Sequence, residues 1–564
     1  MKTERIRQRL HDASHQLADF LHALPDDHPL QIALRTYTLA LSLALGPALL
    51  PFLTSRKART QGLRRALHIL ARELSPNAFA TSITVGVAGG AAIRRLWDRW
   101  TEGEVVGIGT REGGGDRYWD ALHKLRTWAA SLQDWQKSFV SNVVSSILAV
   151  ALLHSRRRHA TSAGVGRPSP TLDLSLLLLV RAMDSAVQMM FFKPSAVQLS
   201  RLTLTQKEDQ QSVNRKWSTR LDALVFWACS ARIMWCFFYE PDRLPRSYNK
   251  WIMTLASIDP RLLAAIRAIR AGKFSYVRGV SIPQDLVTSL SRDLGYPAAW
   301  GDPAVVPAYG LYANPVWRRL SIPGRQGVAG LPCEVVHGGV TGGSCTANAA
   351  IRGAQAFAEA LAIYLPVHFL PIAITRPRKL LEIPRLLATA LSAARSATFL
   401  SAFVSSTWFT ICLTRTLLLA RLFPHISHDF WDGPFGCAFM GSLVCGASIW
   451  IERGSRRGEM ALYVLPRAIR ACLAADWVKS GKFSVRLAER TIFVLSLASL
   501  LTTVVHRPDT LRGLSRWTLA FVMKGPNAGF WRRKRLDTNA PSTPAHLTRT
   551  STPLPEGENV DGTA

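Results

Sequence analysis

The stretch LSLLLLVRAMDSAVQMMFF, residues 174–192, decides the fold class. Only Arg181 and Asp184 are charged in it, and a helix needs about 20 mostly apolar residues to cross a bilayer. Backbone groups in hydrocarbon must be hydrogen-bonded within their own segment, so this stretch predicts a membrane-spanning α-helix. Similar stretches recur along the whole chain.

Ten apolar segments approach this standard, five in each half. Those of the first half are Tyr37–Leu53, Phe79–Leu96, Phe139–His154, Leu174–Phe192 and Leu221–Tyr239. Those of the second half are Ala356–Ile374, Ala397–Leu419, Phe435–Ile451, Met460–Ala475 and Thr491–Val505. Several are short or charged, so eight crossings are the alternative to ten. We predict an all-α, polytopic helical membrane protein of two related halves with four to five transmembrane helices each.

Composition supports this class and indicates the partners. The 564 residues are 48% hydrophobic with a mean hydropathy of +0.09, yet their formal net charge is +31. The two facts agree if apolar segments lie in the lipid bilayer and basic loops face anionic phospholipids. The basic residues are dispersed and form no nucleic-acid-binding module, so nucleic acid is not an expected partner. Membrane-protein partners or a homo-oligomer stay open.

The chain divides into five parts. We expect a cytosolic N-terminal segment at 1–36, a first transmembrane half at 37–251, and a linker with an amphipathic helix and a Pro/Gly-rich loop at 252–332. A second transmembrane half at 333–523 and a disordered basic tail at 524–564 follow. The N-terminal segment mixes acidic and basic residues and has no apolar signal core, so targeting is expected to be internal. The scattered cysteines do not predict a disulfide scaffold.

Three short motifs recur in the same order in both halves, which predicts an internal repeat. The pairs are Ser155–Arg157 with Ser455–Arg457, Leu179–Met183 with Leu465–Ile469, and Pro241–Leu244 with Pro508–Leu511. The halves are therefore expected to superpose, with Arg181 over Arg467 and Ser155 over Ser455.

Charge in the loops predicts the topology. In both halves the loops before the second segment and after the third are strongly basic, so all four are expected on one membrane face. That favours four plus four crossings, with the first segment of each half in the interface; five-helix halves would be inverted repeats. The residues expected at the headgroups are Arg156, Arg157, Glu452, Arg456 and Arg457.

These loop arginines have two interpretations. They either fix orientation only, or they form a working surface for lipid. In the second case Glu452 pairs with Arg456 one turn later and leaves Arg457 free to engage a phospholipid or a partner.

Charges inside spans are costly, by about 2.5 kcal/mol or more, and tend to face partners, water or substrate. The candidates are Arg181, Asp184, Arg232, Arg467 and Arg470. Arg181 and Asp184 are three apart and are expected to pair. Internal salt bridges or snorkelling explain these residues, and a polar path for a lipid headgroup or solute is the functional alternative.

Small residues predict close helix packing, which in lipid depends on the approach of backbones. Gly86 and Gly90 form a Gly-x-x-x-Gly pair, and Ser442 and Gly446 have the same four-residue spacing. Such contacts either serve ordinary packing or border a lateral groove.

Cys333, His337 and Cys345 place two thiols and an imidazole within thirteen residues. Zinc takes these ligands, but a structural site needs a fourth, which Glu334 or a distant residue would have to supply. A disulfide is sterically open but not expected on a cytosol-facing loop. A capped turn is the simpler interpretation, so we expect no metal and no cofactor. In either case Cys333 and Cys345 are predicted near the start of the helix carrying Phe357, with His337 packed nearby.

These residues also carry a family resemblance. The segment from Cys333 to Met523 resembles the N-terminal region of the transmembrane protein 135 family. The matching motifs are Cys333-Glu334-x-x-His337, Ser344-Cys345, Tyr364-x-Pro366, Arg376–Lys379 and Trp450–Gly458. In place of the family's His-Pro before the second Cys, this chain has Thr341–Gly343.

The resemblance implies a multi-pass protein of peroxisomal or mitochondrial membranes, linked to organelle dynamics and to lipid or sterol handling, with no established catalytic residues. It also implies a distant similarity to the mitochondrial inner-membrane protein translocase family.

Three classes of function follow. A transport or channel-like protein would have a polar cavity joining Arg181, Arg232 and Arg467. A structural or scaffolding protein would be a tightly packed bundle with conspicuous exposed loops. A membrane-embedded enzyme would need catalytic groups converging at one depth, but no such motif rises above chance, so we expect no catalytic residues and no enzyme.

Overall fold

The computed structural model describes residues 23–54, 63–102, 116–160, 169, 171–192, 204–322, 324–375, 377–380, 382–480 and 482–525. In these ranges the chain is almost entirely helical, and a single strand pair, β1 (Phe274–Ser275) with antiparallel β2 (Val280–Ser281), is formed. The predicted all-α class is confirmed. Most of the predicted N-terminal segment and nearly all of the predicted tail lie outside the described residues.

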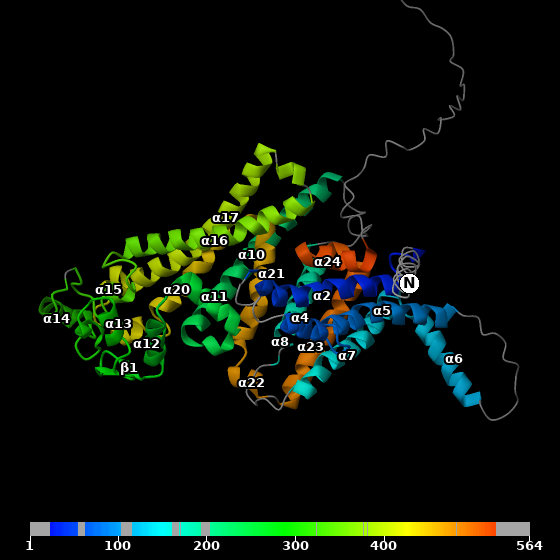
Figure 1. The fold of residues 1–564 in the computed structure, drawn as a ribbon, viewed down its shortest axis with the longest axis horizontal. Coiled ribbons are helices and arrows are strands. Elements are labelled where there is room, and N and C mark those ends of the chain that lie inside the picture. The colour runs from blue at the N-terminus through cyan, green and yellow to red at the C-terminus, as the bar shows by residue number, and fades with distance from the viewer. Residues whose placement is uncertain are drawn as a thin grey trace, which may run out of the picture.

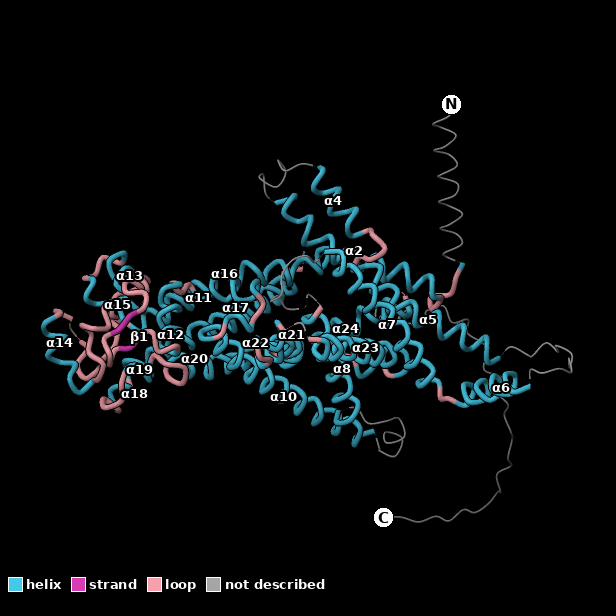
Figure 2. Tube along the Cα trace, turned by 90° about the horizontal axis from the view of Figure 1, so that it is seen from below, coloured by secondary structure: helices cyan, strands magenta, loops and turns pink. Residues whose placement is uncertain are grey.

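The long helices form two bundles (Figures 1 and 2). The first contains α2 (Pro29–Thr54), α5 (Phe79–Glu102), α7 (Asp134–Ala160), α8 (Leu172–Val187), α23 (Phe483–His506) and α24 (Gly513–Lys524). The second contains α10 (Leu204–Tyr239), α11 (Arg246–Ala256), α16 (Cys345–Thr375), α17 (Ile383–Cys412), α20 (Cys437–Cys445) and α21 (Gly454–Cys472). Helices α8 and α21 pack against each other where the bundles meet.

Shorter elements complete the fold. Beside the bundles lie α4 (Leu63–Glu73), α6 (Asp116–Ser131), η1 (Gln188–Phe192), η5 (Pro377–Leu380), η7 (Gly446–Ile451) and α22 (Ala475–Lys479). A small domain at one end contains β1, β2, α12 (Pro260–Arg270), α13 (Thr288–Asp293), η3 (Ala298–Gly301), η4 (Gly310–Tyr312), α14 (Ala313–Arg319) and α15 (Cys333–Val336) (Figure 1). The segment after α17 contributes η6 (Leu413–Leu417), α18 (Leu419–Leu422) and α19 (His428–Trp431).

The two halves of the chain exchange their last long helices. Helix α10 ends the first half but packs against α20 and α21, whereas α23 ends the second half and packs against α7 and α8. Both exchanged helices are followed by one 3-10 turn that starts at a proline, η2 (Pro241–Arg243) and η8 (Pro508–Thr510). The exchange is reciprocal, so each bundle is completed by a helix of the other half. Duplication of the halves, and their superposition, stay predictions.

Six helices in the described ranges are long and apolar enough to cross a membrane. They are Asp134–Ser155, Leu172–Phe192, Ser212–Tyr239, Cys345–Ala373, Ile383–Leu422 and Phe483–His506, with Cys437–Ile451 as a shorter apolar helix. Six of the ten predicted segments fall on these spans, so an integral, multi-pass membrane protein is confirmed, with six candidate crossings in the described ranges.

The remaining predicted segments fail for physical reasons. Phe79–Leu96 belongs to α5, whose second half carries Arg94, Arg95 and Asp98. Met460–Ala475 lies mostly in α21 and itself contains a proline and two arginines, and Phe435–Ile451 is too short. The first segment continues into residues whose side chains lie outside the described part. The predicted interfacial position of the sixth segment is also disfavoured, because Cys345–Ala373 is long enough to span.

Small residues lie at helix contacts, as predicted. A Cβ on Gly86 would lie 3.0 Å from the Cβ of Ala149 in α7, and one on Gly90 would collide with Asn142. A Cβ on Gly446 would lie 2.8 Å from the Cα of Trp227 in α10, and Ser442 is buried one turn earlier. These positions allow α5 to approach α7 and η7 to approach α10 closely.

A buried ion pair fastens the small domain to the second bundle. The Arg415 guanidinium contacts the Asp432 carboxylate at 2.6 and 3.1 Å, and both residues are at most 5% exposed. Arg415 also donates to the Leu331 carbonyl at 2.8 Å, and the Tyr276 hydroxyl donates to Asp432 at 2.8 Å. Burial alone would raise the pKa of Asp432, but attraction to Arg415 and the hydrogen bonds that it accepts hold this pKa below its usual value.

Candidate functional site

An apolar cavity of about 650 Å³ lies between α10, α11, α16, α17 and α21. Aromatic side chains supply much of its wall, among them Phe226, Trp251, Phe399 and Trp408. Glu459 is the single charged side chain in this lining. The aromatic rings on the five helices leave space between them. The resulting cavity has the volume of a typical small-molecule binding site.

A polar pocket of about 530 Å³ adjoins this cavity. Tyr364, Val367, Glu459 and Met460 line both spaces, so α16 and α21 form their common border. The rest of the polar lining includes the cationic or ionisable side chains of His368, Arg385, Arg453 and Arg456. An apolar cavity and a basic pocket therefore lie on opposite sides of the same four side chains.

Arg456 is held in the basic pocket by a hydrogen-bonded cluster. His368 Nδ1 lies 2.8 Å from the Tyr364 carbonyl, which can only accept, so Nδ1 carries the proton and Nε2 accepts from Arg456 at 2.5 Å. Arg456 also donates to Ser396 at 3.0 Å and to the buried Glu452 at 3.5 Å. The predicted pair of Glu452 with Arg456 is thus present.

Arg457 is not left free, whereas the second of the two interpretations of these loops requires it to be free. Its guanidinium donates to the carbonyls of Glu452 and Trp450 at 3.0 and 2.9 Å and lies 4.7 Å from the centre of the Trp450 ring. It therefore ties together the turn before α21. The side chains of Arg156 and Arg157 lie outside the described part of the chain.

The charged residues predicted inside the spans each have their own partner. Arg181 pairs with Glu459 at 3.3 Å and Arg470 with Asp173 at 2.5 Å, so both bonds link α8 to α21. Arg232 donates to the Ala471 carbonyl at 2.9 Å. Arg467 lies 5.1 and 3.8 Å from the rings of Tyr248 and Tyr463, which both line the apolar cavity.

The pair expected between Arg181 and Asp184 is therefore wrong, and the cavity by which a transport or channel-like protein would be recognised is not found at these pockets. Arg181 does not pair with Asp184, because packing between helices gives each a partner on another element. Neither of the two adjoining pockets is lined by Arg181, Arg232 or Arg467, so no polar cavity joins these three arginines there.

Asp184 instead belongs to a three-residue clamp. Arg512 donates to Asp184 at 3.1 Å from Nε, and to Asp222 at 2.8 and 3.1 Å. Burial alone would lower the pKa of Arg512, but the hydrogen bonds that it donates to the two carboxylates, and its attraction to their charges, hold this pKa above its usual value. The clamp joins α8, α10 and the start of α24.

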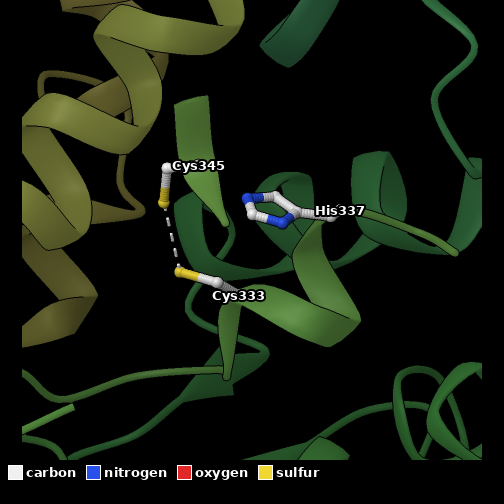
Figure 3. Close-up of side chains that lie close together, drawn as sticks. All are labelled: Cys333, His337 and Cys345. Atoms are coloured by element: carbon white, nitrogen blue, oxygen red, sulfur yellow. Dashed lines mark hydrogen bonds between the residues drawn. The ribbon is translucent and has the colours of Figure 1, made fainter. Parts of the chain in front are cut away.

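The predicted Cys333 motif is brought together as expected (Figure 3). The ligand atoms of Cys333, His337 and Cys345 lie within 4.8 Å of one another, and the two sulfurs are 3.8 Å apart. Cys345 begins α16, the helix that carries Phe357. Cys412 joins this cluster from the end of α17, with its sulfur 3.6 Å from His337 Nε2.

Sequence reasoning missed Cys412 and Glu459 as members of these sites. A single cysteine or glutamate in a helix has no local spacing that links it to residues 75 or 278 positions away. In the sequence, Arg453 and Arg385 could be recognised only as members of basic loops.

Comparison with known proteins agrees with the resemblance found in the sequence. The family model described as the N-terminal cysteine-rich region of Transmembrane protein 135 matches residues 333–474. No curated protein and no solved structure matches the chain. The similarity to the translocase family stays a prediction. The chain is thus a multi-pass helical membrane protein in which residues 333–474 match the model of the cysteine-rich region of the transmembrane protein 135 family.

Proposed function

We propose that this protein binds a membrane amphiphile with an apolar chain and an anionic head group, and acts in lipid transport within its membrane rather than as an enzyme. The observation that carries the proposal is the common border of the apolar cavity and the basic pocket along Tyr364, Val367, Glu459 and Met460. One molecule that crosses this border would place its chain and its head group in matching surroundings.

The apolar cavity suits a hydrocarbon chain. Its wall offers few hydrogen-bonding groups, and Glu459 at the border is already paired with Arg181 at 3.3 Å. Each methylene transferred from water to such a wall contributes about 0.8 kcal/mol. Within a membrane the hydrocarbon chain comes from lipid rather than from water, so its burial in the cavity adds little binding free energy. The cavity therefore accommodates the chain, and the contacts of the head group determine which lipid is bound.

The basic pocket suits a phosphate or carboxylate. Arg385 and Arg453 are exposed, and the Arg385 guanidinium lies 3.7 Å from the Glu382 carboxylate. Guanidinium groups bind phosphate and carboxylate oxygens through paired hydrogen bonds. Arg456 is oriented by its partners, and its position brings a third cation to the same wall.

The test compares anionic with zwitterionic lipid. Full-length protein in detergent is titrated with fluorescent phosphatidic acid and with phosphatidylcholine of equal chain length. We expect tighter binding of phosphatidic acid. The double variant Arg385→Gln/Arg453→Gln should weaken this binding roughly 30-fold, at about 1 kcal/mol per arginine, and leave phosphatidylcholine binding nearly unchanged.

Two controls separate pocket from surface charge. Arg292→Gln removes an exposed arginine of the small domain and should change neither affinity. Val404→Trp fills the apolar cavity and should weaken both lipids alike. Equal affinities for the two lipids in the unmodified protein, or equal losses in the Arg292 and pocket variants, would contradict the proposal.

We propose further that the membrane is that of a peroxisome or a mitochondrion. The support is the match of residues 333–474 to the transmembrane protein 135 region, together with the family association stated above. A fluorescently tagged full-length chain is expected to coincide with a peroxisomal or mitochondrial marker. Coincidence with plasma-membrane or endoplasmic-reticulum markers alone, at low expression, would reject this location.

A further inference from the structure

Four side chains with metal-binding atoms meet at the open end of the α16–α17 hairpin. Cys345 is the first residue of α16 and Cys412 is the last of α17, so both lie opposite the turn that joins these helices. Cys333 and His337 come from α15 and the residue that follows it. All four are at most 5% exposed, and no disulfide joins these cysteines.

Two distances among the four atoms match those of a tetrahedral zinc site. Zinc–sulfur and zinc–nitrogen bonds of about 2.3 and 2.0 Å place two sulfurs about 3.8 Å apart, and a sulfur and a nitrogen about 3.5 Å apart. The Cys333 and Cys345 sulfurs are 3.8 Å apart, and the Cys412 sulfur lies 3.6 Å from His337 Nε2. Two opposite edges of the expected tetrahedron are therefore already formed.

The imidazole is prepared for ligation. His337 Nδ1 lies 2.7 Å from the Gly342 carbonyl, which can only accept, so Nδ1 carries the proton and Nε2 has the free lone pair. Figure 3 shows the ring directed toward the two sulfurs. A ligand histidine in proteins commonly donates its other nitrogen to a carbonyl in this manner.

The charge of the surroundings also fits. Three thiolates, one neutral imidazole and Zn²⁺ have a net charge of minus one. The buried Arg325 donates from Nη1 to the Cys333 sulfur at 3.4 Å and supplies a compensating positive charge. The same guanidinium donates to the Ala329 carbonyl at 2.6 Å, which fixes it beside the cluster.

We propose that Cys333, His337, Cys345 and Cys412 bind one zinc ion, which ties α15 and the small domain to the open end of the α16–α17 hairpin. Binding releases the thiol protons to solvent, and Zn²⁺ is neither oxidised nor reduced. All four positions are filled by protein, as in structural rather than catalytic zinc sites. The site is separate from the lipid pockets and does not depend on the function proposed for them.

A disulfide between Cys333 and Cys345 is the competing fate of these thiols. It would leave His337 and Cys412 without a role in the cluster and would exclude zinc. The two outcomes are distinguished by metal content and by the mass of the linked peptides.

The experiment measures zinc in full-length protein purified in detergent under reducing conditions, after addition of zinc chloride and removal of unbound metal. Mass spectrometry of the metal is expected to give about one zinc per chain. Cys412→Ser should reduce this to below about one tenth, whereas Cys412→Asp, which keeps a zinc ligand of similar size, should retain most of it. Substitution with Co²⁺ should give the visible absorption of tetrahedral thiolate coordination.

Matched controls use cysteines outside the cluster. Cys229→Ser changes a buried thiol of α10, and Cys472→Ser changes an exposed one. Both should bind zinc as the unmodified chain does. Absence of zinc from the unmodified chain, equal zinc in Cys412→Ser, or a Cys333–Cys345 disulfide under the reducing conditions would overturn the proposal.

Discussion

Replacement of Asp432 by Ala is expected to lower the free energy of unfolding by about 3 to 5 kcal/mol. The change leaves the Arg415 guanidinium, 3% exposed, without its counter-ion, and leaves the Tyr276 hydroxyl without its acceptor. Equilibrium unfolding in mixed detergent micelles at pH 7 measures the loss. The lowered pKa of Asp432 means that its contribution is present above the ordinary pKa of about 3.9 and is lost as the pH falls.

An exposed pair provides the control for Asp432. Asp134 contacts Arg94 at 2.9 Å but its side chain is 78% exposed, so Asp134→Ala should cost less than about 1 kcal/mol. The double change Arg415→Met/Asp432→Leu removes both charges and should be more stable than Asp432→Ala, although Leu331 and Tyr276 lose a partner. Equal stability of the Asp432 and Asp134 variants would show that the pair does not hold the small domain.

Replacement of Arg512 by Met is expected to cost a similar amount, about 3 to 5 kcal/mol. The side chains of Asp184 and Asp222 are 8% and 12% exposed, and both depend on this one guanidinium. Without it, two carboxylates face each other in a half-buried site between α8 and α10. The same unfolding measurement detects the loss.

Two further variants test the geometry of the clamp. Arg512→Lys keeps the charge but cannot serve both carboxylates with paired hydrogen bonds, so its stability should lie between those of the Met variant and the unmodified chain. Arg507→Met removes a pair with Asp509 that is 3.7 Å long and partly exposed, and should cost less than about 1 kcal/mol. A Met variant as stable as this control would contradict the role of Arg512.

The sequence reveals what depends on short stretches of chain. The span at Leu172–Phe192 is recognisable because lipid requires a continuous apolar run. The Cys333 motif is also recognisable from a short stretch, because three of its ligand atoms come from thirteen consecutive residues. The pairing of Glu452 with Arg456 was predicted from their spacing of four residues, and it forms although Glu452 lies just before α21 rather than on it.

Contacts between distant segments could not be predicted in this way. A spacing of three favours an Arg181–Asp184 pair on an isolated helix, but α21 brings Glu459 to Arg181 and the turn before α24 brings Arg512 to Asp184. The two adjoining pockets depend on how five helices pack, so no single stretch of the sequence could predict them. The same holds for the fourth ligand, Cys412.

The reciprocal exchange of α10 and α23 has a consequence for biosynthesis. Helix α7 can pack on α5 as soon as both have been made, but α7 and α8 lack their shared neighbour α23 until residues 483–506 have been made. Helix α10 likewise waits for α20 and α21, so the second bundle can close first although most of it is synthesised later. The first bundle is therefore completed only after α23 has been made, although most of its helices are translated first, and a nascent chain that stops before α23 leaves α7 and α8 without this neighbour.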